Sequence, residues 1–136
     1  MAEGEARDPG PDREDPDRLL TDFAERVPGV LRVAVVASDG ALVAASGQAQ
    51  PDQPDQLSAI TAGLMGLASA AARILHGGAV TQALVTTARN TLVIMAIDQG
   101  SSVAVLTTAT ADLDTVAYEM TMLVEEAGSI FTPPAR

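Results

Sequence analysis

This chain of 136 residues has no cysteine and no lysine, and each absence removes a class of chemistry. Without cysteine there is no disulfide framework, thiolate metal site or cysteine nucleophile. All eight basic residues are arginine, which excludes a P-loop lysine, a Schiff base and a Ser-Lys dyad. Aromatic residues make up only 2%, so the core must be built from aliphatic side chains and methionine.

Positive charge is also scarce, because the formal net charge is −10. A phosphate backbone needs lysine and arginine contacts, so nucleic acid is not an expected partner. An anionic membrane surface is disfavoured for the same reason. The acidic N-terminus has no apolar stretch like that of a secretory signal, which favours a cytoplasmic protein.

No group of side chains indicates catalysis. His76 is the only histidine, and it falls at the expected end of a helix, where positive charge is favoured. Asp55 and Asp112 fit helix N-termini better than an acid–base pair. No nucleophile-elbow motif supports a serine triad. We therefore expect no catalytic residue, no cofactor and no metal site, and we predict that the protein is not an enzyme.

The length fits one domain, and a hydrophobic content of 47% is enough for a core. The first residues are rich in Gly, Pro, Asp and Glu, a composition typical of disorder. We expect a disordered acidic tail over residues 1–14, a folded domain over residues 15–128 and a C-terminal tail over residues 129–136.

Hydrophobic periodicity and turn residues predict three helices and five strands in the order αββαβββα. Asp39-Gly40 separates two β-branched runs and predicts a hairpin with a type I′ turn. Short loops between the later strands predict an antiparallel sheet, so the fold class is α+β. The expected helices are a first one capped by Asp15 with Pro16 next, then Asp55–His76 and Asp112–Ala127; the expected strands lie within residues 30–47 and at Val80–Ala88, Thr91–Ile97 and Ser101–Thr108.

The central helix has almost no charged face, since Arg73 is the one charged residue from Leu57 to Leu75. At about 100° per residue, three arcs can be separated. The arc expected to pack on the sheet holds Leu57, Ile60, Leu64, Leu67, Ala71, Ile74 and Leu75. A stripe of small residues that allows close approach of a second helix holds Ala59, Ala62, Gly63, Gly66 and Ala70. A third, uncharged arc includes Ser58, Thr61, Met65 and Ala72.

Three interpretations account for such a helix. It is about long enough to span a membrane, but it is poor in large apolar residues and lies between regular amphipathic elements. It could be buried within its own protomer by the other two helices. We favour a third interpretation, in which a second copy of the chain covers the small stripe across a two-fold homodimer interface.

The order of elements and several segments resemble the roadblock/dynein light chain family. The resemblance rests on the segment Val30–Gly40 after a short helix, on the long Ala/Gly-rich helix and on the strand Thr91–Ile97. It covers roughly residues 17–128. It implies a five-stranded antiparallel sheet with one long helix on one face and two helices on the other, a roadblock/profilin-like sandwich.

The resemblance also implies dimers in which the sheets join through the third strand and the long helices pair. Bacterial members are similar to regulators of Ras-like small GTPases in signalling. We accordingly predict a dimer interface made of the small stripe together with Val80, Ala83 and Val85. The arc of Ser58, Thr61, Met65 and Ala72 is our hypothesis for partner contact.

These observations together predict a non-enzymatic homodimeric regulator or scaffold that binds a Ras-like small GTPase and modulates its nucleotide cycle. Two alternatives remain open at this point. The domain could be a small-molecule sensor, because a sheet with a covering helix can enclose a pocket. It could also be a purely architectural dimerisation module with no effect on nucleotide turnover.

Overall fold

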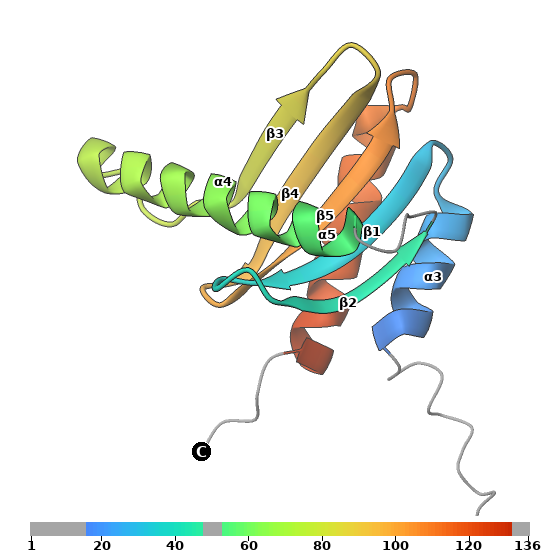
Figure 1. Ribbon diagram of the computed structural model, residues 1–136, viewed down its shortest axis with the longest axis horizontal. Helices are drawn as coiled ribbons and strands as arrows, with labels where there is room; N and C mark the ends of the chain where they lie inside the picture. Colours follow the sequence, from blue (N-terminus) through green and yellow to red (C-terminus); the bar gives the residue numbers. More distant parts are fainter. Residues whose placement is uncertain (1–15, 48–52, 132–136) are drawn as a thin grey trace, which may run out of the picture.

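The computed structural model describes residues 16–47 and 53–131. The expected tail over residues 1–14 and most of the loop before the central helix lie outside these described residues. The elements follow the predicted order and carry the labels of Figure 1. They are α3 (Pro16–Arg26), β1 (Val30–Ala37), β2 (Leu42–Gly47), α4 (Gln53–Leu75), β3 (Gln82–Thr86), β4 (Asn90–Asp98), β5 (Ser101–Thr108) and α5 (Leu113–Phe131).

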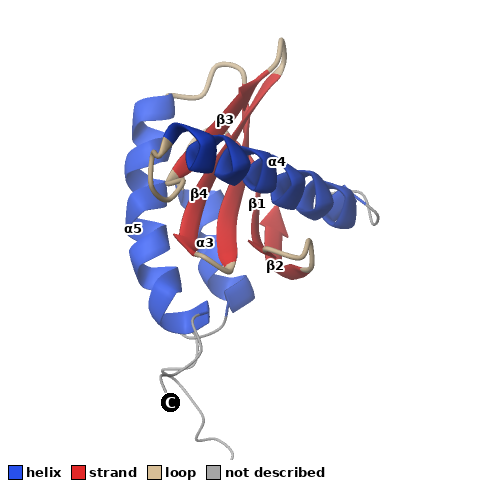
Figure 2. Ribbon diagram, turned by 90° about the vertical axis from the view of Figure 1, so that its left-hand side faces the viewer, coloured by secondary structure: helices blue, strands red, loops and turns tan. Residues whose placement is uncertain are grey.

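The strands form one five-stranded sheet in the order β2-β1-β5-β4-β3, and all neighbours are antiparallel. Helices α3 and α5 cover one face, whereas α4 crosses the other (Figures 1 and 2). The predicted α+β sandwich is therefore confirmed. Strands β2 and β3 are the two edges of the sheet.

The two faces of the sheet are covered very unequally. Strand residues alternate between the faces, and those on the α3/α5 side, among them Val33 and Val105, join Phe23 and Met120 in the larger core. These side chains are fully buried. The α4 side has a much smaller cluster around Ile94, with half-buried residues of α4 and β3 packed against it. The folded protomer thus relies mainly on the α3/α5 layer.

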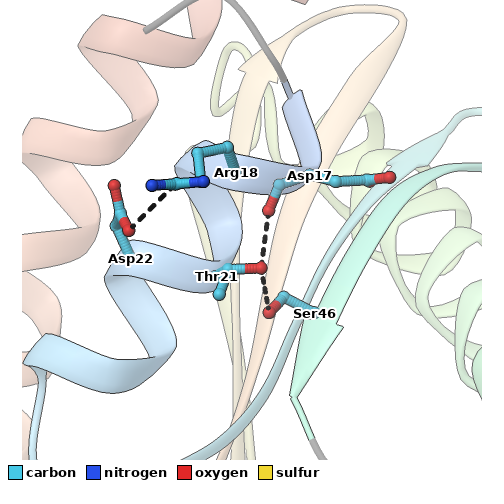
Figure 3. A network of polar contacts seen from close by, with 5 residues as sticks. All are labelled: Asp17, Arg18, Thr21, Asp22 and Ser46. Carbon is cyan, nitrogen blue, oxygen red and sulfur yellow. Dashed lines mark hydrogen bonds and ion pairs between the residues drawn. The ribbon is translucent and has the colours of Figure 1, made fainter. Parts of the chain in front are cut away.

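Polar contacts fix the short helix α3 on the sheet edge. The Ser46 hydroxyl of β2 lies 2.9 Å from that of Thr21, which itself donates to the Asp17 carbonyl at 2.8 Å (Figure 3). At the other end of α3, Arg26 pairs with Glu119 of α5. Helix α3 is therefore tied both to β2 and to α5.

Two local expectations need correction. The β1–β2 turn has a positive φ only at Gly40, at 93°, with Gly40 N donating to Ala37 O at 2.9 Å. This is a hairpin loop with one left-handed residue, not a type I′ turn, which needs two. Helix α5 does not end at Gly128 but continues to Phe131, because a glycine weakens a helix by about 1 kcal/mol without stopping it. Part of the expected C-terminal tail is therefore helical.

Other local predictions are confirmed. Pro16 is the first residue of α3. The Asp112 carboxylate caps α5, since its Oδ1 accepts from Asp114 N at 3.1 Å and from Thr115 N at 3.4 Å. Such a cap stabilises a helix by about 1 kcal/mol.

Candidate interaction surface and cavity

Helix α4 is rotated relative to the predicted orientation. Ser58 and Thr61 face the sheet and are 2% and 1% exposed, whereas Leu67 and Ile74 are 73% and 78% exposed. Only Leu57, Leu64 and Met65 join the cluster on this face of the sheet. The predicted sheet-facing arc is therefore wrong for five of its seven residues, which are all exposed: Ile60, Leu67, Ala71, Ile74 and Leu75. Hydrophobicity alone could not show which of two apolar surfaces meets the sheet of the same protomer.

The C-terminal part of α4 projects past the β3 edge of the sheet (Figure 1), and Figure 2 shows this end toward the viewer. The helix is long and apolar enough to cross a membrane by length and composition, and only 11% of this segment is buried. That test is weak evidence on its own, because helices that pack in soluble proteins also pass it. A large apolar surface is nevertheless left uncovered within one protomer.

The exposed residues of α4 have the spacing of a helix–helix seam. Large side chains at Ile60, Leu67 and Ile74 repeat every seven residues, and the small residues Gly63 and Ala70 fall between them. Spacings of three and four residues form one continuous stripe along a helix. Alternation of large and small residues allows a second helix to interdigitate closely.

The structure gives only some of the predicted small residues a role inside the protomer. A Cβ added at Gly63 or Gly66 meets no atom within 4 Å, so these glycines serve no close contact among the described residues. Ala59 and Ala62 lie 3.9 Å from the position of a Cβ at Gly40 and so pack near the β1–β2 turn. Ala70 is half-buried. A dimer contact of these five residues stays a prediction.

Helix α4 ends in a tight hydrogen-bonded cap. Gly77 N donates to Ala72 O at 2.8 Å and His76 N to Arg73 O at 3.2 Å, the pair of bonds that defines a Schellman motif. His76 occupies the position that usually holds glycine and has a φ of 55°. A left-handed non-glycine residue costs roughly 1–2 kcal/mol. The expected helix end at His76 is thus one residue late, because α4 ends at Leu75.

Strand β3 is an edge strand of the sheet, and no other strand among the described residues pairs with its outer side. Ala96 N donates to Thr81 O at 3.0 Å, and Thr87 N to Asn90 O at 2.9 Å. Because hydrogen-bonded and non-bonded positions alternate in an antiparallel pair, Ala83 and Val85 direct their amides toward β4. The amides of Gln82, Leu84 and Thr86 then point away from the sheet.

Val80, Ala83 and Val85, predicted from the sequence as interface residues, are half-buried in the protomer, and their contact with a second copy stays a prediction. The side chains of Ala83 and Val85 pack in the cluster beneath α4, and Val80 lines a cavity before the strand starts. The outward backbone belongs to Gln82, Leu84 and Thr86, which we did not predict from the sequence. The register against β4, which selects them, is not visible in the residue pattern.

The predicted partner-binding arc is only partly available. Ser58 and Thr61 are buried, so the prediction that they contact a partner is wrong for this conformation. Small polar side chains sit at the closest approach of α4 to the sheet instead. Met65 and Ala72 are half-buried, and their contact with a partner stays a prediction.

A cavity of about 700 Å³ runs beneath one flank of α4. Helix α4 lines it with Thr61, Met65, Ser69 and Arg73, which recur every fourth residue. The opposite wall comes from the ends of β1 and β4, the start of β5 and the loop before β3, with Val36, Val80, Asp98 and Ser102 among its residues. Its volume is within the range of small-molecule sites.

The described residues contain no group of three or more His, Asp or Glu side chains arranged to hold a metal ion. The sole histidine is exposed at the end of α4. What the structure assembles is an apolar helix face, an open strand edge and a cavity, which are features of an interaction module.

Comparison with known protein families identifies this α+β sandwich, in which a long exposed helix lies beside an open sheet edge. The model of the Roadblock/LC7 domain matches residues 16–107. The chain therefore belongs to the Roadblock/LC7 family. Members of this family are regulatory or scaffold proteins, so membership supports a regulatory role.

Solved structures agree with this assignment. A Roadblock/LC7 domain from Streptomyces avermitilis is 30% identical, with a TM-score of 0.82, over 88% of this chain and 99% of that one. MglB from Myxococcus xanthus has the same fold at 17% identity, with a TM-score of 0.79, over 85% of this chain and 93% of that one. An MglB described with a tetrameric arrangement is 16% identical, with a TM-score of 0.79, over 90% and 91%. None of the curated proteins compared with this chain matches it.

Proposed function

We propose that this chain is a cytoplasmic homodimeric regulator or scaffold that binds a Ras-like small GTPase and modulates its nucleotide cycle in bacterial signalling. The observation that carries the dimer is the uncovered apolar stripe of α4 next to the free edge of β3. The family resemblance supports a Ras-like GTPase as the partner, because bacterial roadblock proteins are similar to regulators of such enzymes. The tetrameric arrangement described for one MglB structure supports self-association.

The stripe and the strand edge fit one two-fold contact. Pairing of β3 with its copy satisfies the outward backbone groups of Gln82, Leu84 and Thr86 and joins two sheets edge to edge. The same operation brings the projecting ends of the two α4 helices together, so that Ile60, Leu67 and Ile74 face the small residues of the other copy. Neither surface then stays exposed to water.

Regulation follows from differential affinity. A dimer that binds one switch conformation of the GTPase better than the other shifts the equilibrium between them by that difference in binding free energy. It needs no catalytic side chain. A scaffold is the limiting case, in which both conformations bind equally well and nucleotide turnover does not change.

The test uses Ras-like GTPases from the organism that encodes this chain, each loaded with GDP or with a non-hydrolysable GTP analogue. We expect at least one to bind the dimer, with different affinities in the two states and with a changed rate of GTP hydrolysis or nucleotide exchange. Equal affinities for the two nucleotide states, with unchanged rates of hydrolysis and exchange, would indicate a scaffold that does not regulate the GTPase. Binding of none of these GTPases in either state would contradict the proposal.

A further inference from the structure

The cavity beneath α4 has a closed end and an open end. At one end, Thr61 and Val36 are each 1% exposed. At the other, Arg73 and Asp98 are exposed. The twelve residues from Thr61 to Arg73 span about 18 Å of helix axis, at about 1.5 Å per residue. The arginine side chain leans back toward the helix N-terminus, so the space between the two polar groups is somewhat shorter.

The closed end holds an unsatisfied polar group. Thr61 Oγ1 is buried and has no hydrogen-bond partner among the described residues. A buried hydroxyl without a partner destabilises a protein, and proteins rarely tolerate it. Thr61 lines the cavity, so a molecule in the cavity that carries a hydrogen-bonding group can reach this end.

The open end carries a cation without a counter-ion. Within the described part of the chain, Arg73 has no ion pair, unlike Arg18, which pairs with Asp22, and Arg26, which pairs with Glu119. Asp98 also lines the cavity, but its Oδ1 accepts from Gly100 N at 2.7 Å and from the Ser101 hydroxyl at 3.1 Å. The carboxylate is thus engaged in its own turn, whereas the guanidinium remains available for an anion.

The walls between these ends are largely apolar, with Val36, Met65, Ala79, Val80 and Ala96 among the lining residues. We propose that the cavity binds an elongated small molecule that has a carboxylate or phosphate at one end, an apolar body and a hydroxyl or carbonyl at the other. The anionic group pairs with Arg73, and the distal polar group completes the hydrogen bonding of Thr61.

A second copy of the chain is not the expected occupant. At about 100° per residue, the cavity stripe that begins at Thr61 and ends at Arg73 lies on roughly the opposite side of α4 from the stripe centred on Leu67. A helix that packs against Leu67 therefore leaves the cavity open. The site goes beyond the proposed GTPase contact and does not depend on it.

Isothermal titration calorimetry of the full chain tests the site with decanoate, 10-hydroxydecanoate and decyl phosphate as probes, and with decyltrimethylammonium as the charge-reversed control. We expect the anionic probes to bind and the cationic one not to bind. Because a neutral hydrogen bond contributes about 0.5–1.5 kcal/mol, 10-hydroxydecanoate should bind roughly 2- to 10-fold more tightly than decanoate. Absence of binding by every anionic probe, or equal binding of the cation, overturns the proposal.

Variants locate the two ends. Arg73→Gln should weaken binding of the anionic probes about tenfold or more, whereas Arg89→Gln, an equal charge change on the exposed β3–β4 turn, should not. Thr61→Val should remove the preference for the hydroxylated probe and leave decanoate binding unchanged. Ser69→Leu should abolish binding by filling the cavity, with the circular dichroism spectrum unchanged. An equal effect of Arg73→Gln and Arg89→Gln, or dissociation of the dimer by the probes, argues against this site.

Discussion

Truncation of Leu67 on α4 probes the proposed helix pairing with little disturbance of the protomer itself. The side chain is 73% exposed, so replacing it by alanine removes few contacts within one chain. Complete burial of a leucine side chain stabilises by about 1.5–3 kcal/mol. About three-quarters of that gain, roughly 1–2 kcal/mol, is therefore still available for a contact outside the protomer.

A two-fold interface contains the substitution twice. The expected loss is thus about 2–4 kcal/mol of dimerisation free energy, which raises the dissociation constant roughly 30- to 700-fold at 1.4 kcal/mol per factor of ten. Sedimentation velocity across a dilution series measures this constant for the parent chain and for Leu67→Ala.

Met122 on α5 offers a matched control. It is also a large exposed apolar residue, at 48% exposure, but its helix covers the other face of the sheet (Figure 2). We expect Met122→Ala to dimerise like the parent chain. If Leu67→Ala also dimerises like the parent chain, or if both substitutions weaken the dimer equally, the stripe on α4 is not the interface.

Three further substitutions test local features of the structure. His76→Gly should raise the free energy of unfolding by about 1 kcal/mol in urea titrations, because glycine adopts the left-handed position without strain, whereas His76→Ala should give no such gain. Asp112→Ala should lower the free energy of unfolding by about 1 kcal/mol through loss of the α5 cap, and retention of parental stability would show that the cap contributes nothing. Gly63→Ala should stabilise the dissociated protomer by about 1 kcal/mol yet raise the dimer dissociation constant, since the added Cβ meets nothing in its own chain; tighter association would contradict close helix approach at this position.

Most of the fold was predictable because its signals are local. Periodicity located all eight elements, and Asp112 marked the start of α5 through the capping preference of aspartate. The β-branched runs of β1, β4 and β5 predicted strands, and the structure has strands there. Such features depend on neighbouring residues only, and tertiary contacts did not override them.

The orientation of α4 was not predictable in the same way. Its sequence offers apolar residues on nearly every side, so the choice of face depends on what the sheet and any second copy present to it. Ser58 and Thr61 occupy the sheet-facing side, and the large apolar residues remain outside. The cavity and the outward amides of β3 were not predictable for the same reason. Both depend on how α4 and β4 are placed against segments that are distant in the sequence.

We infer that a second copy of the chain covers α4 and the open edge of β3. Backbone amide hydrogen exchange, resolved by NMR at a concentration where the protein is associated, tests it most directly. Ala83 and Val85 donate toward β4 and serve as internal references that are protected in any case. If β3 pairs with its copy, the amides of Gln82, Leu84 and Thr86 are protected to a comparable degree, and dilution removes this protection. Fast exchange of these three amides at every concentration, with Ala83 and Val85 protected, would show that β3 does not pair.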